Sequence, residues 1–369
     1  MASPNTGPTA GAGGGAGAGA ASAGNGGSSV DGGGAGADPN LPAWTDVTGD
    51  LAGRSNSGGG VVYVSAKPDE PMLIAGVAGD GLWGSTDGGM TWNALGQTGA
   101  SDMITNLVNS IVYDPDHPEV FWETGIYVGG GLYRSDDDGK TIVELGGNAP
   151  ELLPLTDQVR HNDLVSVDFT DAKRRTLLVG GHEQKQRLYL SQDTGKTWSM
   201  VGDTIPIDAG FSSFPQVIDA QNFLVGVSNQ ILRSADGGAS WTTVSKVGGW
   251  NPPAQTPDGS IYWQIENYAG VMRSDDQGLT WNRAVGAGIS SGPLIALPDG
   301  SLASQTATNV IVSRDRGVSW TVVSSAFPFV PSGLTYSVPL KAFFTWITSG
   351  KMNLPGGSIM RYDWDYQTQ

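Results

Sequence analysis

The sequence predicts an all-β protein, a seven-bladed β-propeller whose last blade is completed by the first strand of the chain. Three observations carry the prediction: an octapeptide that recurs six times, short alternating segments on both sides of each copy, and complementary half-units at the two chain ends. A β unit repeated every ~40–50 residues, with four strands in each unit, is typical of a propeller.

The octapeptide has the pattern Ser-x-Asp-x-Gly-x-Thr/Ser-Trp, and its successive starts are separated by 50, 56, 43, 40 and 39 residues. Its Asp can accept backbone N–H bonds within a turn, its Gly can adopt positive φ, and its Trp offers a large apolar face to a neighbouring unit. Only the second copy departs, with Ile in the Trp position. The six copies are Ser85–Trp92, Ser135–Ile142, Ser191–Trp198, Ser234–Trp241, Ser274–Trp281 and Ser313–Trp320.

The two chain ends account for a seventh unit. Residues 44–47 match the segment that follows each octapeptide, and residues 358–363 match the segment that precedes one. We therefore expect the N-terminal strand to pair with the C-terminal strands, which removes the exposed edges that an open ring would leave. Six blades with free ends is the alternative.

The composition excludes several classes of protein. The chain of 369 residues has no Cys, 20 basic and 36 acidic side chains and a net charge of −16. Without Cys there is neither a disulfide scaffold nor a thiolate metal site. The acidic balance argues against a nucleic-acid partner, which needs clustered cations. No window approaches the ~18 apolar residues of a membrane span.

Residues 1–41 differ from the rest, with 14 glycines and no Lys or Arg. Such a segment cannot bury enough apolar surface to offset the entropy of ordering, so we predict a disordered tether and a propeller over residues 42–369. Tethers of this kind join exported bacterial domains to an anchor, so we expect an extracellular, cell-surface or periplasmic location. The sequence as given carries no secretion signal. A tail without function is the alternative.

The octapeptide resembles the Asp-box, or BNR repeat, of sialidases, family 74 xyloglucan hydrolases and sortilin-type receptors, and the resemblance covers residues 43–369. It implies that the boxes are structural and that ligands bind on the opposite face, formed by the connections between blades and by the turns between second and third strands. Two departures argue against simple transfer of activity. The first inner strand, residues 61–65, lacks the sialidase Arg, and Ala78 stands where family 74 has its acid, with Asp80 two residues on.

Four residues form the candidate acid–base set. His161 opens the inner strand of the third blade and His182 follows its second strand, so the two imidazoles are expected within ~10 Å of each other on the channel face. Imidazole titrates near neutrality and can act as an acid, a base or a metal ligand. Glu123 and Glu266 are the carboxylate candidates, and a purely structural role for each of the four remains the alternative.

Aromatic and polar residues at equivalent positions of other blades suit a sugar, because an aromatic face stacks on the ring and polar groups bind the hydroxyls. The candidate binding residues are Arg54, Tyr127, Asp163, Glu183, Trp263, Gln264, Tyr268 and Trp346.

The sequence thus favours an exported, monomeric, carbohydrate-active enzyme of the glycoside hydrolase or polysaccharide lyase type, with no cofactor. A non-catalytic propeller that binds glycans or proteins is the alternative. An enzyme needs one asymmetric site with perturbed ionisable groups, whereas a lectin should show similar aromatic pockets on several blades.

Overall fold

The structure is a computed structural model that describes residues 41–54, 60–96, 104–127, 131–145, 162–182, 185–206, 214–265, 270–284, 292–348 and 357–368, with the backbone alone at 162 and 163. The expected tether lies outside these residues except for Leu41, so its disorder stays a prediction. None of the helices in the described ranges is long and apolar enough to cross a membrane.

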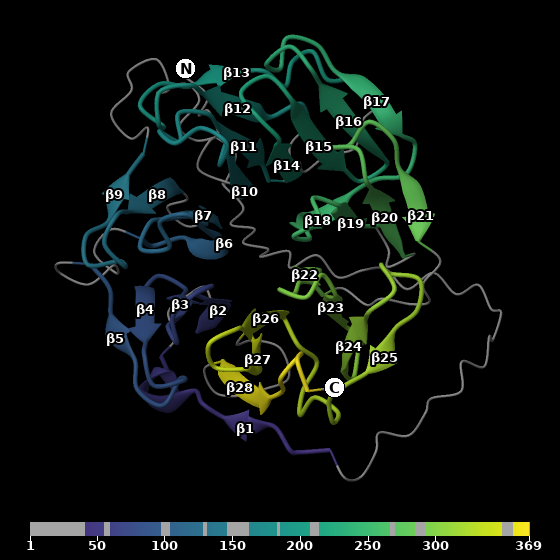
Figure 1. Ribbon diagram of the computed structural model, residues 1–369. Coiled ribbons are helices and arrows are strands. Elements are labelled where there is room, and N and C mark those ends of the chain that lie inside the picture. Colours follow the sequence, from purple (N-terminus) through teal and green to yellow (C-terminus); the bar gives the residue numbers. More distant parts are fainter. Residues whose placement is uncertain are drawn as a thin grey trace, which may run out of the picture. The chain divides into compact units, whose positions relative to one another are not determined.

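Seven antiparallel sheets of four strands form a ring, which confirms the predicted propeller (Figure 1). Blades one to three are β2 (Val61–Ala66), β3 (Leu73–Val77), β4 (Gly81–Ser85), β5 (Asn93–Ala94); β6 (Leu107–Tyr113), β7 (Phe121–Ile126), β8 (Gly131–Ser135), β9 (Val143–Glu144); and β10 (Asn162–Val167), β11 (Leu177–Gly181), β12 (Leu188–Ser191), β13 (Ser199–Met200).

Blades four to six are β14 (Phe214–Val217), β15 (Phe223–Val227), β16 (Gln230–Ser234), β17 (Thr242–Ser245); β18 (Trp250–Gln255), β19 (Ile261–Gln264), β20 (Val271–Ser274), β21 (Asn282–Ala284); and β22 (Ile295–Ala296), β23 (Leu302–Gln305), β24 (Val310–Ser313), β25 (Thr321–Val322). Blade seven is β26 (Gly333–Ser337), β27 (Ala342–Ile347), β28 (Ser358–Asp363) and β1 (Thr45–Asp46), and a short helix, η1 (Gly49–Leu51), follows β1.

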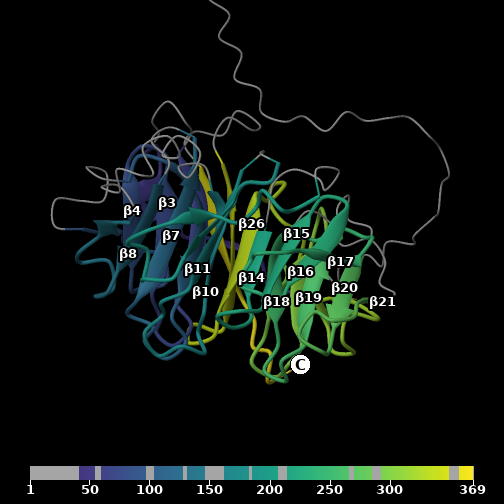
Figure 2. The ribbon, with the colours of Figure 1, turned by 90° about the horizontal axis from the view of Figure 1, so that it is seen from above.

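The core lies between the blades. Seven apolar clusters are found, and each joins the facing sides of two neighbouring sheets, including blades seven and one. Seen from the side, the sheets stand next to one another with their strands running between the two faces of the ring (Figure 2). The second strands are covered on both sides by neighbouring blades, so β3 and β15 are buried along their whole length, whereas outermost strands such as β5 and β9 are exposed.

The two chain ends meet in blade seven, as predicted. Strand β1 pairs antiparallel with β28, with Thr45 opposite Arg361 and Asp46 opposite Met360. The pairing continues beyond the strand, because the backbone N–H of Val47 donates to the Ile359 carbonyl at 2.9 Å. The two-residue N-terminal strand therefore supplies the outer edge of the last sheet.

All six octapeptides form the same loop between the third and outermost strands. In blade four, Ser234 donates to Asp236 Oδ1 at 2.8 Å, and Asp236 accepts both the backbone N–H (2.9 Å) and the hydroxyl (2.6 Å) of Ser240. The Gly238 N–H donates to the Ser234 hydroxyl. Equivalent bonds occur in the other five copies. The hydroxyl and backbone donors lower the pKa of Asp236 to about 2.

Candidate ligand-binding site at the channel mouth

A cavity of about 230 Å³ lies where the inner strands begin, at the end of the ring opposite the turns between first and second strands. We call it the channel-mouth cavity. Among the residues that the structure describes, none that lines the cavity carries a charge. They are Val62, Tyr63, Val64, Val108, Asn109, Phe214, Asn251, Pro252, Pro293, Ser332, Gly333, Leu334, Thr335 and Trp346.

β-Bulges bring several of these residues to the cavity. In four blades the register between the first and second strands shifts near the channel mouth. A bulge breaks the in–out alternation of a strand and re-aims the extra residue. The residues inside the shifts are Val62, Asn109, Asp163 and 251–253. Three of the four bulges thus contribute to the lining, and Asp163 occupies the corresponding position in blade three.

Asn251 is held in place by two of the predicted binding residues. Its φ of 63° is a left-handed conformation that Asn adopts more readily than most residues. The Trp263 indole N–H donates to the Asn251 carbonyl at 2.8 Å, and the Asn251 amide donates to Gln264 Oε1 at 2.8 Å. Trp263 and Gln264 are fully buried and neither lines the cavity. Their role in this structure is to position Asn251.

Trp346 was predicted to bind the ligand, and it does line the cavity. Its indole N–H donates to the Val62 carbonyl at 2.9 Å, and its ring meets Tyr63 edge-on with centroids 5.5 Å apart. Burial raises the pKa of Tyr63, whose hydroxyl is hydrogen-bonded to the backbone of Ile111. Two aromatic rings are thus fixed at the boundary of blades seven and one.

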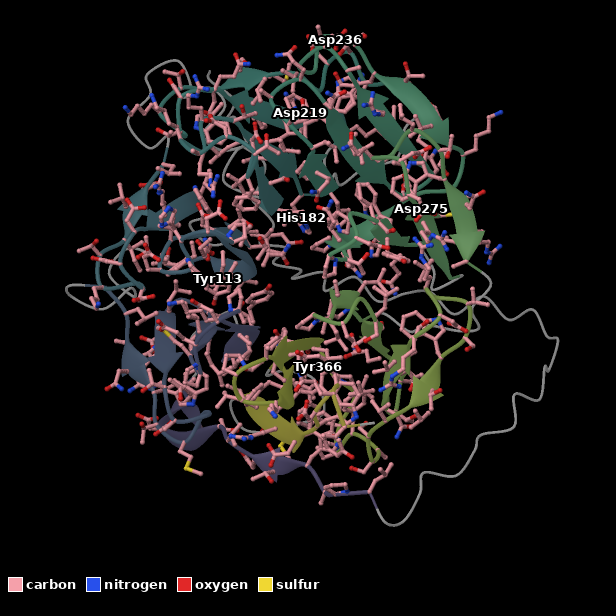
Figure 3. The ribbon with its side chains drawn as sticks, viewed as in Figure 1. Tyr113, His182, Asp219, Asp236, Asp275 and Tyr366 are labelled. Carbon is pink, nitrogen blue, oxygen red and sulfur yellow. The ribbon has the colours of Figure 1, made fainter. Side chains whose placement is uncertain are left out.

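Tyr127 and His182, from neighbouring blades, come together beside the channel. The Tyr127 hydroxyl lies 2.9 Å from His182 Nε2, and the rings are almost perpendicular with centroids 5.2 Å apart. Tyr127 has a φ of 52°, which is unusual for a bulky side chain and is found at functional sites more often than elsewhere. Figure 3 shows His182 on the side of the ring that faces its centre. The pair joins one predicted binding residue to one predicted catalytic residue.

Arg54 lies against blade one rather than in the cavity lining. Its guanidinium is 3.9 Å from the centroid of the Trp83 ring and pairs with Asp80 at 3.2 Å. Asp80 is the acidic residue nearest in sequence to position 78, where the resemblance implies a catalytic acid. In this structure a guanidinium already neutralises its carboxylate.

Glu123 lies in the interior, not on the ligand face. It is fully buried and shares its side of β7 with Phe121, which belongs to the core between blades one and two. Asn106 donates to Glu123 Oε2 at 3.5 Å, while Oε1 has no partner among the described residues. Burial raises the pKa of this carboxyl well above its usual value, which favours its protonated form.

The remaining candidates lie outside the described residues: His161, Glu183, Glu266, Tyr268 and the side chain of Asp163. Their roles stay predictions. Within the described ranges no group of three or more His, Asp or Glu side chains is arranged to hold a metal ion.

Sequence reasoning missed the inner-strand residues that line the cavity, among them Tyr63, Asn109, Phe214, Asn251 and Thr335. One signal was present. The Pro-Pro pair that follows Asn251 cannot donate to a ladder, and proline inside a strand indicates a bulge or an edge.

No protein-family model matches the chain, and no curated protein matches its sequence. Solved structures do match its fold. A GH74 xyloglucanase from Xanthomonas campestris is 18% identical with a TM-score of 0.56, over 82% of this chain and 53% of the enzyme. YCF48 bound to D1 peptide is 15% identical with a TM-score of 0.53, over 88% and 98% of the two chains.

The extracellular domain of a protein from B. thetaiotaomicron is 9% identical with a TM-score of 0.53, over 86% of this chain and 40% of the other. The chain thus spans about half the length of the xyloglucanase. At these identities the likeness shows the propeller fold, and the neighbours include both an enzyme and a protein bound to a peptide.

Proposed function

We propose that the channel-mouth cavity binds a neutral oligosaccharide and that the propeller acts as a glycan-binding module. The observation that supports the proposal is the described part of the lining, which combines aromatic rings, amides and hydroxyls without a charged side chain. Apolar walls with a few convergent polar groups are typical of small-ligand sites. A sugar ring would stack on Trp346 or Tyr63 while its hydroxyls bond to Asn109 and Asn251.

Two further facts support the binding of such an oligosaccharide without catalysis. The described lining offers no carboxylate to act as a general acid, and Glu123 is buried in the core. Among the proteins of similar fold, the xyloglucanase acts on xyloglucan, as its name states. We therefore choose xyloglucan and cello-oligosaccharides as the first probes.

The test is calorimetric titration with these oligosaccharides. Wild type should bind, and Trp346→Phe and Asn251→Gly should each weaken binding by roughly tenfold, since one removes part of the stacking surface and the other the amide. Trp320→Phe, in the octapeptide loop of blade six, is the matched control and should bind as wild type does. If no neutral oligosaccharide binds, or if both mouth variants bind normally, the proposal is wrong.

Catalysis is the second candidate, favoured by the Tyr127–His182 hydrogen bond and by the bulge that contains Asp163 beside the strand end that leads to His182. In this alternative His182 and an acid from Asp163, His161 or Glu266 would act as the acid–base pair in glycoside hydrolysis or a lyase reaction. Release of reducing ends from the same oligosaccharides by wild type, but not by His182→Ala, would support it. Binding without any product release would reject it.

We also infer that the protein works outside the cytoplasm as a monomer. The composition of residues 1–41 and the fold shared with an extracellular domain support the location. Fractionation of cells that express the native gene and light scattering of the purified chain test the two statements.

A further inference from the structure

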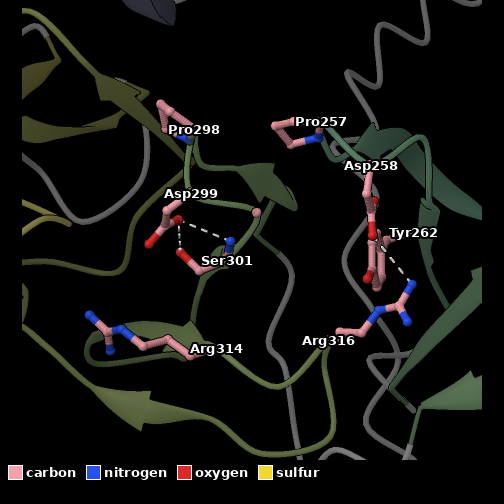
Figure 4. Close-up of a pocket in the computed structure, with 9 residues that line it drawn as sticks. Pro257, Asp258, Tyr262, Pro298, Asp299, Ser301, Arg314 and Arg316 are labelled. Atoms are coloured by element: carbon pink, nitrogen blue, oxygen red, sulfur yellow. Dashed lines mark hydrogen bonds and ion pairs between the residues drawn. The ribbon is translucent and has the colours of Figure 1, made fainter.

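A second cavity, of about 450 Å³, opens between blades five and six at the end of the ring away from the channel mouth. We call it the blade five–six pocket. Figure 4 shows its two walls, each carrying a proline and an aspartate from a turn between a first and a second strand. Both turns have the sequence Pro-Asp-Gly-Ser, at residues 257–260 and 298–301. The glycines of both turns have the same φ of 84°.

The charges on the blade-five wall are satisfied. Arg316, from the octapeptide loop of blade six, reaches back to blade five and donates to Asp275 at 2.6 Å and to the Ser260 hydroxyl at 2.8 Å. It also pairs with Asp258 at 3.4 Å. Asp258 Oδ1 is occupied as well, because it accepts the Thr256 hydroxyl at 2.7 Å.

The equivalent charges on the blade-six wall are only partly satisfied. Asp299 Oδ1 accepts the backbone N–H and the hydroxyl of Ser301, at 3.0 and 2.6 Å, while Oδ2 has no partner among the described residues. Arg314 lines the same wall, and of the described arginines it is the one with no hydrogen bond or ion pair. Blade six therefore presents one unpaired guanidinium and one available carboxylate oxygen.

The closure of the ring explains this difference. Arg316 is the fourth residue of an octapeptide and bonds to the preceding blade. Blade seven has no octapeptide, because its outermost strand is β1. No described residue of blade seven therefore reaches Asp299 as Arg316 reaches Asp258. The bridge that neutralises every charge of one wall is missing at the next.

We infer that the blade five–six pocket binds a small zwitterion of the α-amino acid class, with its carboxylate on Arg314 and its ammonium on Asp299. Guanidinium and carboxylate match in a two-bond fork, and the Asp299 oxygen is the acceptor for an ammonium group. The exposed Pro257 and Pro298 provide an apolar surface for an aliphatic side chain. The four charged side chains of the lining sum to zero, which suits a neutral zwitterion better than an anion.

The experiment is calorimetric titration of the full chain with L-leucine and with two analogues that each lack one charged group. These are 4-methylpentanoate, without the ammonium, and 3-methylbutan-1-amine, without the carboxylate. L-Leucine should bind, and each analogue should bind roughly tenfold more weakly or worse, because a charge-assisted hydrogen bond is lost. Equal affinity for L-leucine and either analogue would overturn the zwitterion assignment, as would no binding of L-leucine.

Two variants identify the partner of each group. Arg314→Gln should weaken L-leucine and 4-methylpentanoate but leave 3-methylbutan-1-amine unchanged. Asp299→Asn keeps the Oδ1 acceptor that holds the turn, and it should weaken L-leucine and the amine but not 4-methylpentanoate. Arg175→Gln, at an exposed arginine in a blade-three turn, is the control. If both pocket variants bind L-leucine as the control does, the site is not this pocket. None of these residues lines the channel mouth, so the result is independent of the oligosaccharide test.

Discussion

The two ends of the ring are built in opposite ways. At the end that carries the turns between first and second strands, charged side chains cross from blade to blade: Lys67 bonds to Asp138, Arg174 to Asp114, and Arg316 to Asp258. At the channel mouth the described lining is uncharged, and its bulges differ from blade to blade. Ionic contacts thus join several pairs of neighbouring blades at one end, whereas the described lining of the cavity at the other end is uncharged.

The largest effect should come from Arg174→Ala at the charged end. Arg174 and Asp114 are both buried and share two bonds of 2.7 Å, so removing the guanidinium leaves an uncompensated carboxylate. We expect a loss of about 3–5 kcal/mol in the free energy of unfolding, measured with denaturant. The adjacent Arg175→Ala breaks an exposed pair, which contributes little in solvent, and should cost far less. Similar losses of unfolding free energy in the two variants would show that the buried ion pair matters no more than the exposed one.

Glu123→Gln tests the interior. The folded-state pKa of Glu123 is raised by burial, so the folded protein keeps a proton that the unfolded chain releases above about pH 4.5. Wild-type stability should therefore fall as pH rises, by about 1.4 kcal/mol per pH unit from this one group until the folded pKa is reached. Glu123→Gln lacks this penalty and should exceed wild type in stability at pH 8, with the difference shrinking towards pH 4.5. A difference that does not change with pH would show that Glu123 is ionised in the fold.

Asp87→Asn tests one octapeptide loop. The Thr91 hydroxyl and backbone N–H lower the pKa of Asp87 to about 2, below the ~3.9 of an unfolded Asp. Its ionised form therefore stabilises the fold above about pH 4, and that contribution is lost as pH falls from 4 to 2. The variant should melt a few degrees below wild type at pH 7 and at the same temperature near pH 2. A gap that persists at pH 2 would mean that the loop depends on shape rather than charge.

The smallest effect on stability should come from Asn251→Gly at the channel mouth. Glycine accepts the φ of 63° without strain, so the loss should be that of the hydrogen bond to Gln264, about 1 kcal/mol. Asn251→Ala places a Cβ in the same conformation and should cost about 1 kcal/mol more than Gly. Chemical denaturation of the pair measures the difference. If Gly is the less stable of the two, the left-handed conformation is not what this position requires.

The propeller fold could be predicted from the repeated octapeptide, but the lining of the channel-mouth cavity could not. The physical reason is the sequence distance over which the contacts act. The shared Ser, Asp, Gly and Thr or Ser of each octapeptide bond to one another within eight residues, so the sequence alone reveals this loop, and the half-units at the two ends reveal the closure. The mouth depends on where a bulge interrupts a strand, and a shift of one residue moves a side chain to the other face. Trp263 and Gln264 were therefore predicted as ligand contacts, although they support Asn251 from the core. Trp346 does line the cavity, and its contact with a ligand stays a prediction.

The closing strand has a mechanical consequence. Only Thr45 and Asp46 form β1, and Trp44 anchors it through its ring contacts with Phe327 and Tyr362. Any pull on the chain ahead of Trp44 is transmitted first to this seam, where few bonds resist it. Tension applied to the N-terminal side of Trp44 would thus separate β1 from β28 before it disrupts any other sheet, and the ring would open in blade seven.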